Sequence, residues 1–314
     1  MATPTQPPRR VGITVNVSAR TEHTSDLSEL SVLVAEFAGS EFTHLELGAN
    51  GLGVVIDGAA HPARLRALRE ALSGCEQRLT LHGSWTSSGR VGNLLDPGSR
   101  PAQVNGLLAD LEIAAAIGAE VVVYHAGTLA GAFEDNAALD AGLAGERDAL
   151  RRLGERAAQD GIVIAVENRA PTPRVIARRS HGMRPDLVAA QVRAVDHPNV
   201  TMCLDTGHAF LASRYIGFDF LDAVRDVAPL VGHVHLSDNF GRIGPPDADL
   251  REMELLGEGD LHLPPGWGSI PLREVLAVPY PRDPVVIIEI RHLHHYPEAL
   301  AAYRSLLPAA GAVR

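Results

Sequence analysis

The chain has 314 residues, of which 46% are hydrophobic and 21% charged, a composition typical of a globular protein. Its 38 acidic and 28 basic residues give a net charge of −10, which argues against a general attraction to nucleic-acid phosphates or anionic membranes. All the basic residues are Arg, so the sequence excludes mechanisms that need a lysine amine, including Schiff-base aldolases and pyridoxal phosphate enzymes.

The N-terminal segment and the cysteines give no sign of export or of a cysteine-based site. Residues Met1–Arg10 are rich in Pro and Thr and contain no apolar segment, so we expect a loose tail at 1–10. No run of 18 apolar residues occurs, and Cys75 and Cys203 lie far apart without a CxxC pattern. A cytoplasmic protein without disulfides or membrane insertion is therefore expected.

Eight short apolar runs rich in β-branched residues recur along the chain and alternate with Ala-, Leu- and Arg-rich stretches. This alternation is typical of βα units and a parallel sheet. The predicted strands are Val11–Asn16, Thr43–Leu47, Arg78–His82, Glu120–His125, Ile162–Glu167, Val200–Asp205, Val231–His235 and Val285–Glu289. The predicted helices are Leu27–Ala38, Pro62–Ser73, Pro101–Ile117, Asn136–Gln159, Pro185–Val195, Phe218–Val227, Ile270–Leu276 and Pro297–Leu306.

The lengths of the connections favour a closed barrel with one working face. Three connections are long, Gly83–Arg100, Asn168–Arg184 and Leu236–Ser269, and each follows a strand. In a (β/α)8 barrel the loops after the strands carry the active site. We therefore predict an α/β fold, a single (β/α)8 TIM barrel over residues 11–314 with long loops at the C-terminal face. A doubly wound open sheet is the structural alternative.

Polar side chains stand at or near the end of each predicted strand. Six consecutive strands end in a side chain that is able to bind a metal. In a barrel these ends converge on one face, so residues far apart in the sequence become neighbours. The eight strand-end residues are Asn16, Glu46 (one residue before its end), His82, His125, Glu167, Asp205, His235 and Glu289.

Three of these carboxylates end strongly apolar runs, in IVIAVE, VTMCLD and PVVIIE. A buried carboxylate needs a cation or strong hydrogen-bond donors to offset its desolvation, so we predict a metal bound by this trio and His235. His208 and the pair Asp260 and His262 lie on loops that reach the same face. The mixture of imidazole and carboxylate suits Zn²⁺, Mn²⁺, Fe²⁺ or Co²⁺. His233 is expected to lie one layer deeper, as a core histidine or a support for the site.

The strings LHGSW, VYHAG, VENR, LDTGHAF, HVHLSDN, GEGDLHLPPGWG and IIEIR occur in this order from the third to the eighth strand. This order resembles the xylose isomerase-like TIM-barrel superfamily, which contains sugar isomerases and epimerases, inosose dehydratases and the endonuclease IV enzymes. The resemblance implies that the two glutamates act on the substrate as well as on the metal, and that His208 contacts substrate or a second metal. It implies a metal site of Glu167, Asp205, His235 and Glu289.

The resemblance to endonuclease IV enzymes extends to all nine ligands of their three zinc ions. This match implies additional metals at His82, His125, His208, Asp260 and His262. Many sugar-acting relatives are similar at these positions. DNA cleavage also needs a basic groove, whereas this chain has a net charge of −10 and no lysine. In a mononuclear enzyme the same side chains would bind substrate hydroxyls instead.

Loop residues around the predicted site suggest the class of substrate. Five arginines lie on the long loop after the fifth strand and would suit an anionic substrate, although a solvated loop explains them equally well: Arg169, Arg174, Arg178, Arg179 and Arg184. Arg169 directly follows the site strand and is the best candidate contact. Trp85 and Trp267 follow predicted ligands, and aromatic faces pack against sugar C–H groups, although ordinary loop packing is an alternative.

The leading hypothesis is a divalent-metal-dependent sugar isomerase or epimerase, in which Glu167 and Glu289 transfer protons next to a carbonyl. The alternatives are a metal-dependent dehydratase or lyase of keto sugars, a multinuclear phosphoesterase similar to endonuclease IV, and a metal-binding module without catalysis. A small carbohydrate-like molecule is the expected partner, with substrate contacts from His82, His125, His208 and His262. Nucleic acid and membranes are not expected as partners. The sequence leaves open whether the chain forms a homo-oligomer.

Overall fold

The computed structural model describes residues 10–15, 27–83, 93–128, 136–172, 175–176, 181–245 and 249–308. Apart from Arg10, the tail predicted at 1–10 lies outside these residues, as does Asn16. The division into a tail and one domain over 11–314 therefore stays a prediction. Among the described residues, no helix combines the length and the hydropathy that a membrane crossing requires.

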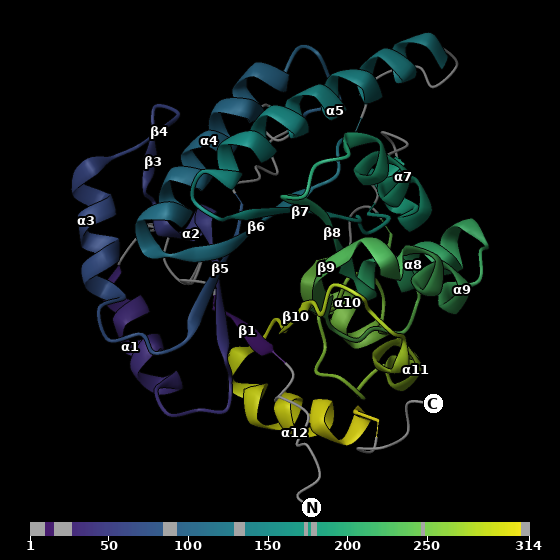
Figure 1. The fold of residues 1–314 in the computed structure, drawn as a ribbon. Coiled ribbons are helices and arrows are strands. Elements are labelled where there is room, and N and C mark those ends of the chain that lie inside the picture. The colour runs from purple at the N-terminus through teal and green to yellow at the C-terminus, as the bar shows by residue number, and fades with distance from the viewer. Residues whose placement is uncertain are drawn as a thin grey trace, which may run out of the picture.

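Eight parallel strands form a closed barrel, which confirms the predicted (β/α)8 fold (Figure 1). The first strand pairs with the last, with Val11 opposite Val286 and Ile13 opposite Ile288, so the open-sheet alternative is wrong. Every predicted strand is present, with ends that differ by at most one residue. The barrel strands are β1 (Val11–Val15), β2 (His44–Gly48), β5 (Arg78–His82), β6 (Ala119–His125), β7 (Val163–Glu167), β8 (Val200–Asp205), β9 (Val231–Leu236) and β10 (Val285–Ile288).

A layer of helices surrounds the barrel, and their apolar sides pack against the outer faces of the strands (Figure 1). This contact buries the largest hydrophobic cluster of the described residues, and burial of apolar surface is the main driving force for folding. The predicted helices appear within two residues of their expected ends. They are α1 (Leu27–Phe37), α3 (Pro62–Ala71), α4 (Arg100–Ile117), α5 (Asn136–Ala158), α7 (Pro185–Val195), α9 (Phe220–Val227), α11 (Leu272–Ala277) and α12 (Tyr296–Leu306).

Several elements were not predicted, and most of them follow strands on the working face. The most important is α8 (Thr206–Ile216), because it begins directly after β8 and carries His208. The other additional elements are α2 (Ala49–Leu52), the hairpin β3 (Val55–Ile56) and β4 (Ala59–Ala60), α10 (Leu250–Leu256), and the 3-10 turns η1 (His181–Met183), η2 (Ala228–Leu230) and η3 (Leu293–His295).

The interior of the barrel changes from apolar to polar toward the C-terminal ends of the strands. Val121, Val123, Ala165 and Cys203 form a small buried cluster inside it. Beyond this cluster, buried acids and histidines replace the apolar side chains. The fold therefore gathers ionisable groups into one region of a largely apolar protein.

Candidate metal centre

Four side chains at the ends of neighbouring strands form the centre of the site. The structure brings together the four predicted metal ligands, which offer ligand atoms that all lie within 4.8 Å of one another: Glu167, Asp205, His235 and Glu289. They come from β7, β8, β9 and the residue that follows β10. The first three are fully buried.

One nitrogen of His235 faces all three carboxylates. Its Nδ1 atom lies 3.3 Å from Glu167 Oε1, 3.1 Å from Glu289 Oε2 and 3.9 Å from Asp205 Oδ2. Carboxylate oxygens and one imidazole nitrogen in this arrangement match the donors that Zn²⁺, Mn²⁺ and Co²⁺ accept.

Asp205 has two functions, because each of its carboxylate oxygens faces a different element. Oδ1 accepts a hydrogen bond from the His208 backbone N–H at 2.6 Å and caps the N-terminus of α8. Its main chain is paired with the side-chain amide of Asn168 in both directions. Oδ2 is left facing the site, buried and without a hydrogen-bond partner among the described residues. The cap thus fixes the orientation of the carboxylate.

A second group of ionisable side chains lies beside the first. Asp260 Oδ2 is 3.1 Å from His208 Nε2 and 2.9 Å from His262 Nε2. His262 Nδ1 lies 3.7 Å from Glu289 Oε1, which links the two groups. The backbone of His262 has a φ of 48°, in the left-handed region that non-glycine residues rarely adopt.

His82 and His125 approach the centre from β5 and β6. Their Nε2 atoms lie 3.4 Å and 2.9 Å from Glu167 Oε2. All nine side chains that the sequence pointed to as metal ligands therefore belong to one connected cluster.

Comparisons with known proteins agree with this architecture. The model of the xylose isomerase-like TIM barrel family matches residues 36–306 of the chain. The chain belongs to this family. No curated protein matches it by sequence.

Solved structures similar to this xylose isomerase-like barrel include sugar epimerases and an endonuclease IV. A D-tagatose 3-epimerase-like protein has a TM-score of 0.69 at 20% identity, covering 95% of this chain and 96% of its own. The 3-keto-D-glucoside 4-epimerase of E. coli has a TM-score of 0.61 at 18% identity, covering 94% and 99%. Endonuclease IV of Thermus thermophilus has a TM-score of 0.56 at 24% identity, covering 95% and 98%. At these identities the likeness establishes the fold.

Charged side chains at the centre of this xylose isomerase-like barrel shift one another's pKa values. Burial acts to raise the pKa of Glu167, but His125 and His235 outweigh it and hold this pKa well below its usual range. Burial likewise opposes His235 and His262 at Glu289, where the two imidazoles lower the pKa to about 2. Asp205 differs: burial, reinforced by Glu167, Glu289 and Asp260 and opposed by His208, raises its pKa to about 7.

The histidines divide into two classes. Burial lowers the pKa of His125 to about 4. Burial also acts to lower the pKa of His262, but Asp260 and Glu289 outweigh it and raise this pKa to about 9. In the same way, Asp205 and Asp260 outweigh burial at His208, and its pKa rises well above the usual value. Near neutral pH, protons on His208 and His262 therefore offset the carboxylates.

The structure describes only some of the residues that the sequence predicts to contact substrate. Trp267 is 48% exposed and packs against the ring of His295, with centroids 4.8 Å apart. The guanidinium of Arg169 donates to the backbone carbonyl of Ala126 at 3.4 Å. Arg184 forms an exposed ion pair with Asp186, as the solvated-loop alternative predicts. Trp85, Arg174, Arg178 and Arg179 lie outside the described residues.

Three further residues support the site, and the sequence patterns assign none of them a role. Glu46 contacts His233 and His235 beneath the four ligands. The carboxylate of Asp238 accepts backbone hydrogen bonds from Asn239, Gly266 and Ile270, and a Cβ at Gly268 would collide with it. Arg291 holds the segment Asp260–His262 from the outside. The HVHLSDN string contains Asp238 and the IIEIR string contains Arg291, so both strings carried a signal, whereas no quoted string contains Glu46.

Proposed function

We propose that the chain is a divalent-metal-dependent sugar isomerase or epimerase. The observation that carries this proposal is the cluster of Glu167, Asp205, His235 and Glu289, whose ligand atoms lie within 4.8 Å of one another. It is supported by the family and by the sugar epimerases among the structures that share the fold.

The residues present fit a divalent cation. Asp205 Oδ2 and Asp260 Oδ1 are buried oxygens without a hydrogen-bond partner among the described residues, a costly arrangement unless a cation offsets it. Glu167, Asp205, His235 and Glu289 would hold the ion. When bound, it would polarise a sugar carbonyl and the adjacent hydroxyl, and so acidify the neighbouring C–H.

The two glutamates would perform the proton transfer. Glu167 and Glu289 come from β7 and from the end of β10, so they reach His235 from different strands. One carboxylate would remove the proton from the substrate carbon and become a carboxylic acid. This acid, or the other carboxyl once it has taken a proton from solvent, would return a proton to the same or the adjacent carbon. The lowered pKa of each carboxyl keeps it ionised, which is the form that a base requires, and also makes it a weaker base.

The remaining groups would bind the sugar. His82, His125, His208 and His262 present ring nitrogens around the centre and would hydrogen-bond to substrate hydroxyls. Trp267 exposes a face that suits sugar C–H groups. The absence of lysine leaves arginine as the only permanently charged cationic side chain for an anionic substrate, and Arg169 is the described candidate.

A multinuclear phosphoesterase is the second candidate. The specific observation in its favour is the group His208, Asp260 and His262, whose ligand atoms also lie within 4.8 Å of one another. In that case these residues would hold further ions, water would attack a phosphate ester, and the glutamates would serve as ligands. A dehydratase or lyase of keto sugars would share the initial proton removal with the leading proposal.

The test combines metal stoichiometry with a substrate screen. The protein is stripped of metal, reloaded with Mn²⁺, Co²⁺ or Zn²⁺, and incubated in D₂O with ketoses, inososes, 3-keto sugars and phosphate esters. We expect one equivalent of metal and deuterium at the carbon next to a carbonyl, lost in Glu289→Gln. Two or three tight equivalents together with cleavage of a phosphate ester and no deuterium exchange would support the phosphoesterase instead.

A further inference from the structure

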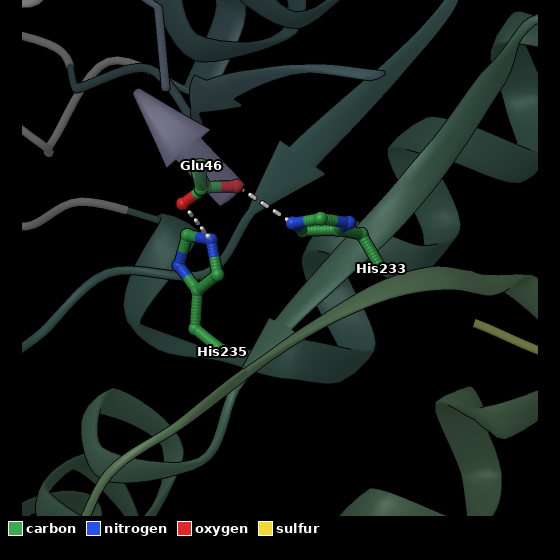
Figure 2. A group of neighbouring side chains, drawn as sticks. All are labelled: Glu46, His233 and His235. Atoms are coloured by element: carbon green, nitrogen blue, oxygen red, sulfur yellow. Dashed lines mark hydrogen bonds and ion pairs between the residues drawn. The ribbon is translucent and has the colours of Figure 1, made fainter. Parts of the chain in front are cut away.

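Glu46 occupies an unusual place for a carboxylate, because it is fully buried inside the barrel beneath the four ligands. Figure 2 shows it between two imidazoles that come from β9. Glu46 Oε1 lies 2.9 Å from His235 Nε2, and Oε2 lies 2.8 Å from His233 Nε2. Oε2 also accepts a hydrogen bond from the hydroxyl of Thr80 at 3.0 Å.

These contacts place a carboxylate at one nitrogen of His235 and so bear on which nitrogen a cation would use. A neutral imidazole carries its proton on one nitrogen and a lone pair on the other. In the metal-free chain Nδ1 also contacts Glu167, but a cation bound there would take the lone pair of Nδ1 and leave the proton on Nε2, 2.9 Å from Glu46 Oε1. Nδ1 is the atom that faces Glu167, Asp205 and Glu289. Histidines that bind metals commonly have their other ring nitrogen held by a carboxylate in this way.

A separate metal site at Glu46, His233 and His235 explains the geometry less well. These three residues also offer ligand atoms within 4.8 Å of one another. However, His233 Nε2 already forms a hydrogen bond with Glu46 Oε2 at 2.8 Å. The ion-pair contact of 2.9 Å between His235 Nε2 and Glu46 Oε1 is shorter than the spacing of two donor atoms around one tetrahedral ion. An ion about 2.0–2.2 Å from each donor atom would have to push them apart inside a fully buried layer.

We propose that Glu46 is a positioning residue of the metal centre, which holds His235 with Nε2 protonated and Nδ1 directed at the bound ion. His233 and Thr80 complete the hydrogen bonds of the carboxylate and fix its plane. This inference rests on the metal centre of the proposed function, but not on the identity of the sugar or on the reaction.

Glu46→Gln tests the proposal with little change of volume, and Glu120→Gln is the matched control. Glu120 Oε1 contacts His44 Nε2 at 2.7 Å, so it is also a carboxylate bound to a buried histidine, but it lies at the start of β6 and away from the site. Glu46→Gln should weaken Zn²⁺ binding about 10–100-fold, because the supporting negative charge is lost. Glu120→Gln should change Zn²⁺ affinity less than about twofold, which lies within ordinary variation for a group remote from the ion.

The imidazole ¹⁵N–¹H spectrum of the Zn²⁺-loaded wild type provides an independent readout that a packing role would not move. We expect zinc on Nδ1 of His235 and a slowly exchanging proton on Nε2, which exchanges faster in Glu46→Gln. Zinc on Nε2, or equal Zn²⁺ affinities for the Glu46 and Glu120 variants, would overturn the proposal. Neither measurement uses a substrate, so a failure to turn over any sugar would reject the proposed function and leave this inference standing.

Discussion

Arg291 provides a direct test of how the second ligand group is held in place. Its backbone N–H donates to His262 O at 3.0 Å, its Nη2 to Asp260 O at 2.7 Å and its Nε to Leu261 O at 3.4 Å. Three successive carbonyls of one segment are thus bound by a single residue. The segment needs this support, because the left-handed backbone of His262 costs about 1–3 kcal/mol.

Arg291→Met keeps the aliphatic stem but removes both side-chain donors. The loss of two hydrogen bonds from an exposed cation should cost about 1–2 kcal/mol, which corresponds to a factor of about 5–30 in the population of the closed segment. The backbone N–H of Leu263, which donates to Asp238 O at 3.0 Å, reports this opening by hydrogen exchange. Its exchange rate should rise about 5–30-fold.

The control for this variant is Arg273→Met, because Arg273 is also exposed and donates to one backbone carbonyl, that of Ser305, at 3.0 Å. We expect no change at Leu263 in the control. Equal exchange rates at Leu263 in the wild type and in Arg291→Met would refute the reasoning, since the segment would then be held without the guanidinium.

Three further predictions concern the chemistry of the centre. Glu289→Gln should keep the circular dichroism of the wild type and lose deuterium incorporation into substrate; unchanged incorporation would reject its role in proton transfer. His125→Ala should reduce kcat/KM about 10–100-fold while metal content stays at one equivalent, and loss of one ion from a wild type that holds two or three would favour the phosphoesterase. The raised pKa values of His262, about 9, and of Asp205, about 7, predict how metal-free stability depends on pH. The contribution of His262 to the free energy of unfolding is complete below about pH 6.5 and is lost as the pH rises through 9. The burial of Asp205 lowers the free energy of unfolding as the pH rises from about 4 to 7, because its carboxyl must then ionise inside the protein. Thermal melts in EDTA and in Zn²⁺ should therefore diverge as the pH rises, and a constant difference would contradict this.

The barrel and most of its site could be predicted because both depend on local patterns. Each strand is a short apolar run, and parallel strands place their last residues on the same face. The ends of β5 to β9 could therefore be listed as neighbours without knowing any distance. Closure of the barrel rests on the contact between β1 and β10, which are far apart in the sequence and gave no local signal.

The predictions failed where one residue serves two purposes or where a contact crosses the barrel. Asp205 was interpreted as a ligand alone, so the helix that it caps, α8, was missed. Glu46 and His233 are 187 positions apart, and no periodicity indicates that they touch. For Arg184 the sequence leaves substrate binding and a solvated loop open, and its ion pair with Asp186 at the surface agrees with the solvated loop. Such pairings depend on the register and side-chain directions of the folded chain.

The protonation of the second group connects the number of metals to the reaction. Asp260 raises the pKa of both His208 and His262, so without further ions these imidazoles carry protons at neutral pH. A protonated imidazole cannot bind a metal, but it donates hydrogen bonds to the hydroxyls or the developing enolate of a sugar. Additional metals would have to displace these protons, and the same residues would then be ligands around a water nucleophile. If the chain is the proposed isomerase, His208 and His262 keep these protons when one ion binds, whereas a phosphoesterase with additional metals would release them. A count of the protons released by each equivalent of metal therefore distinguishes the two proposals.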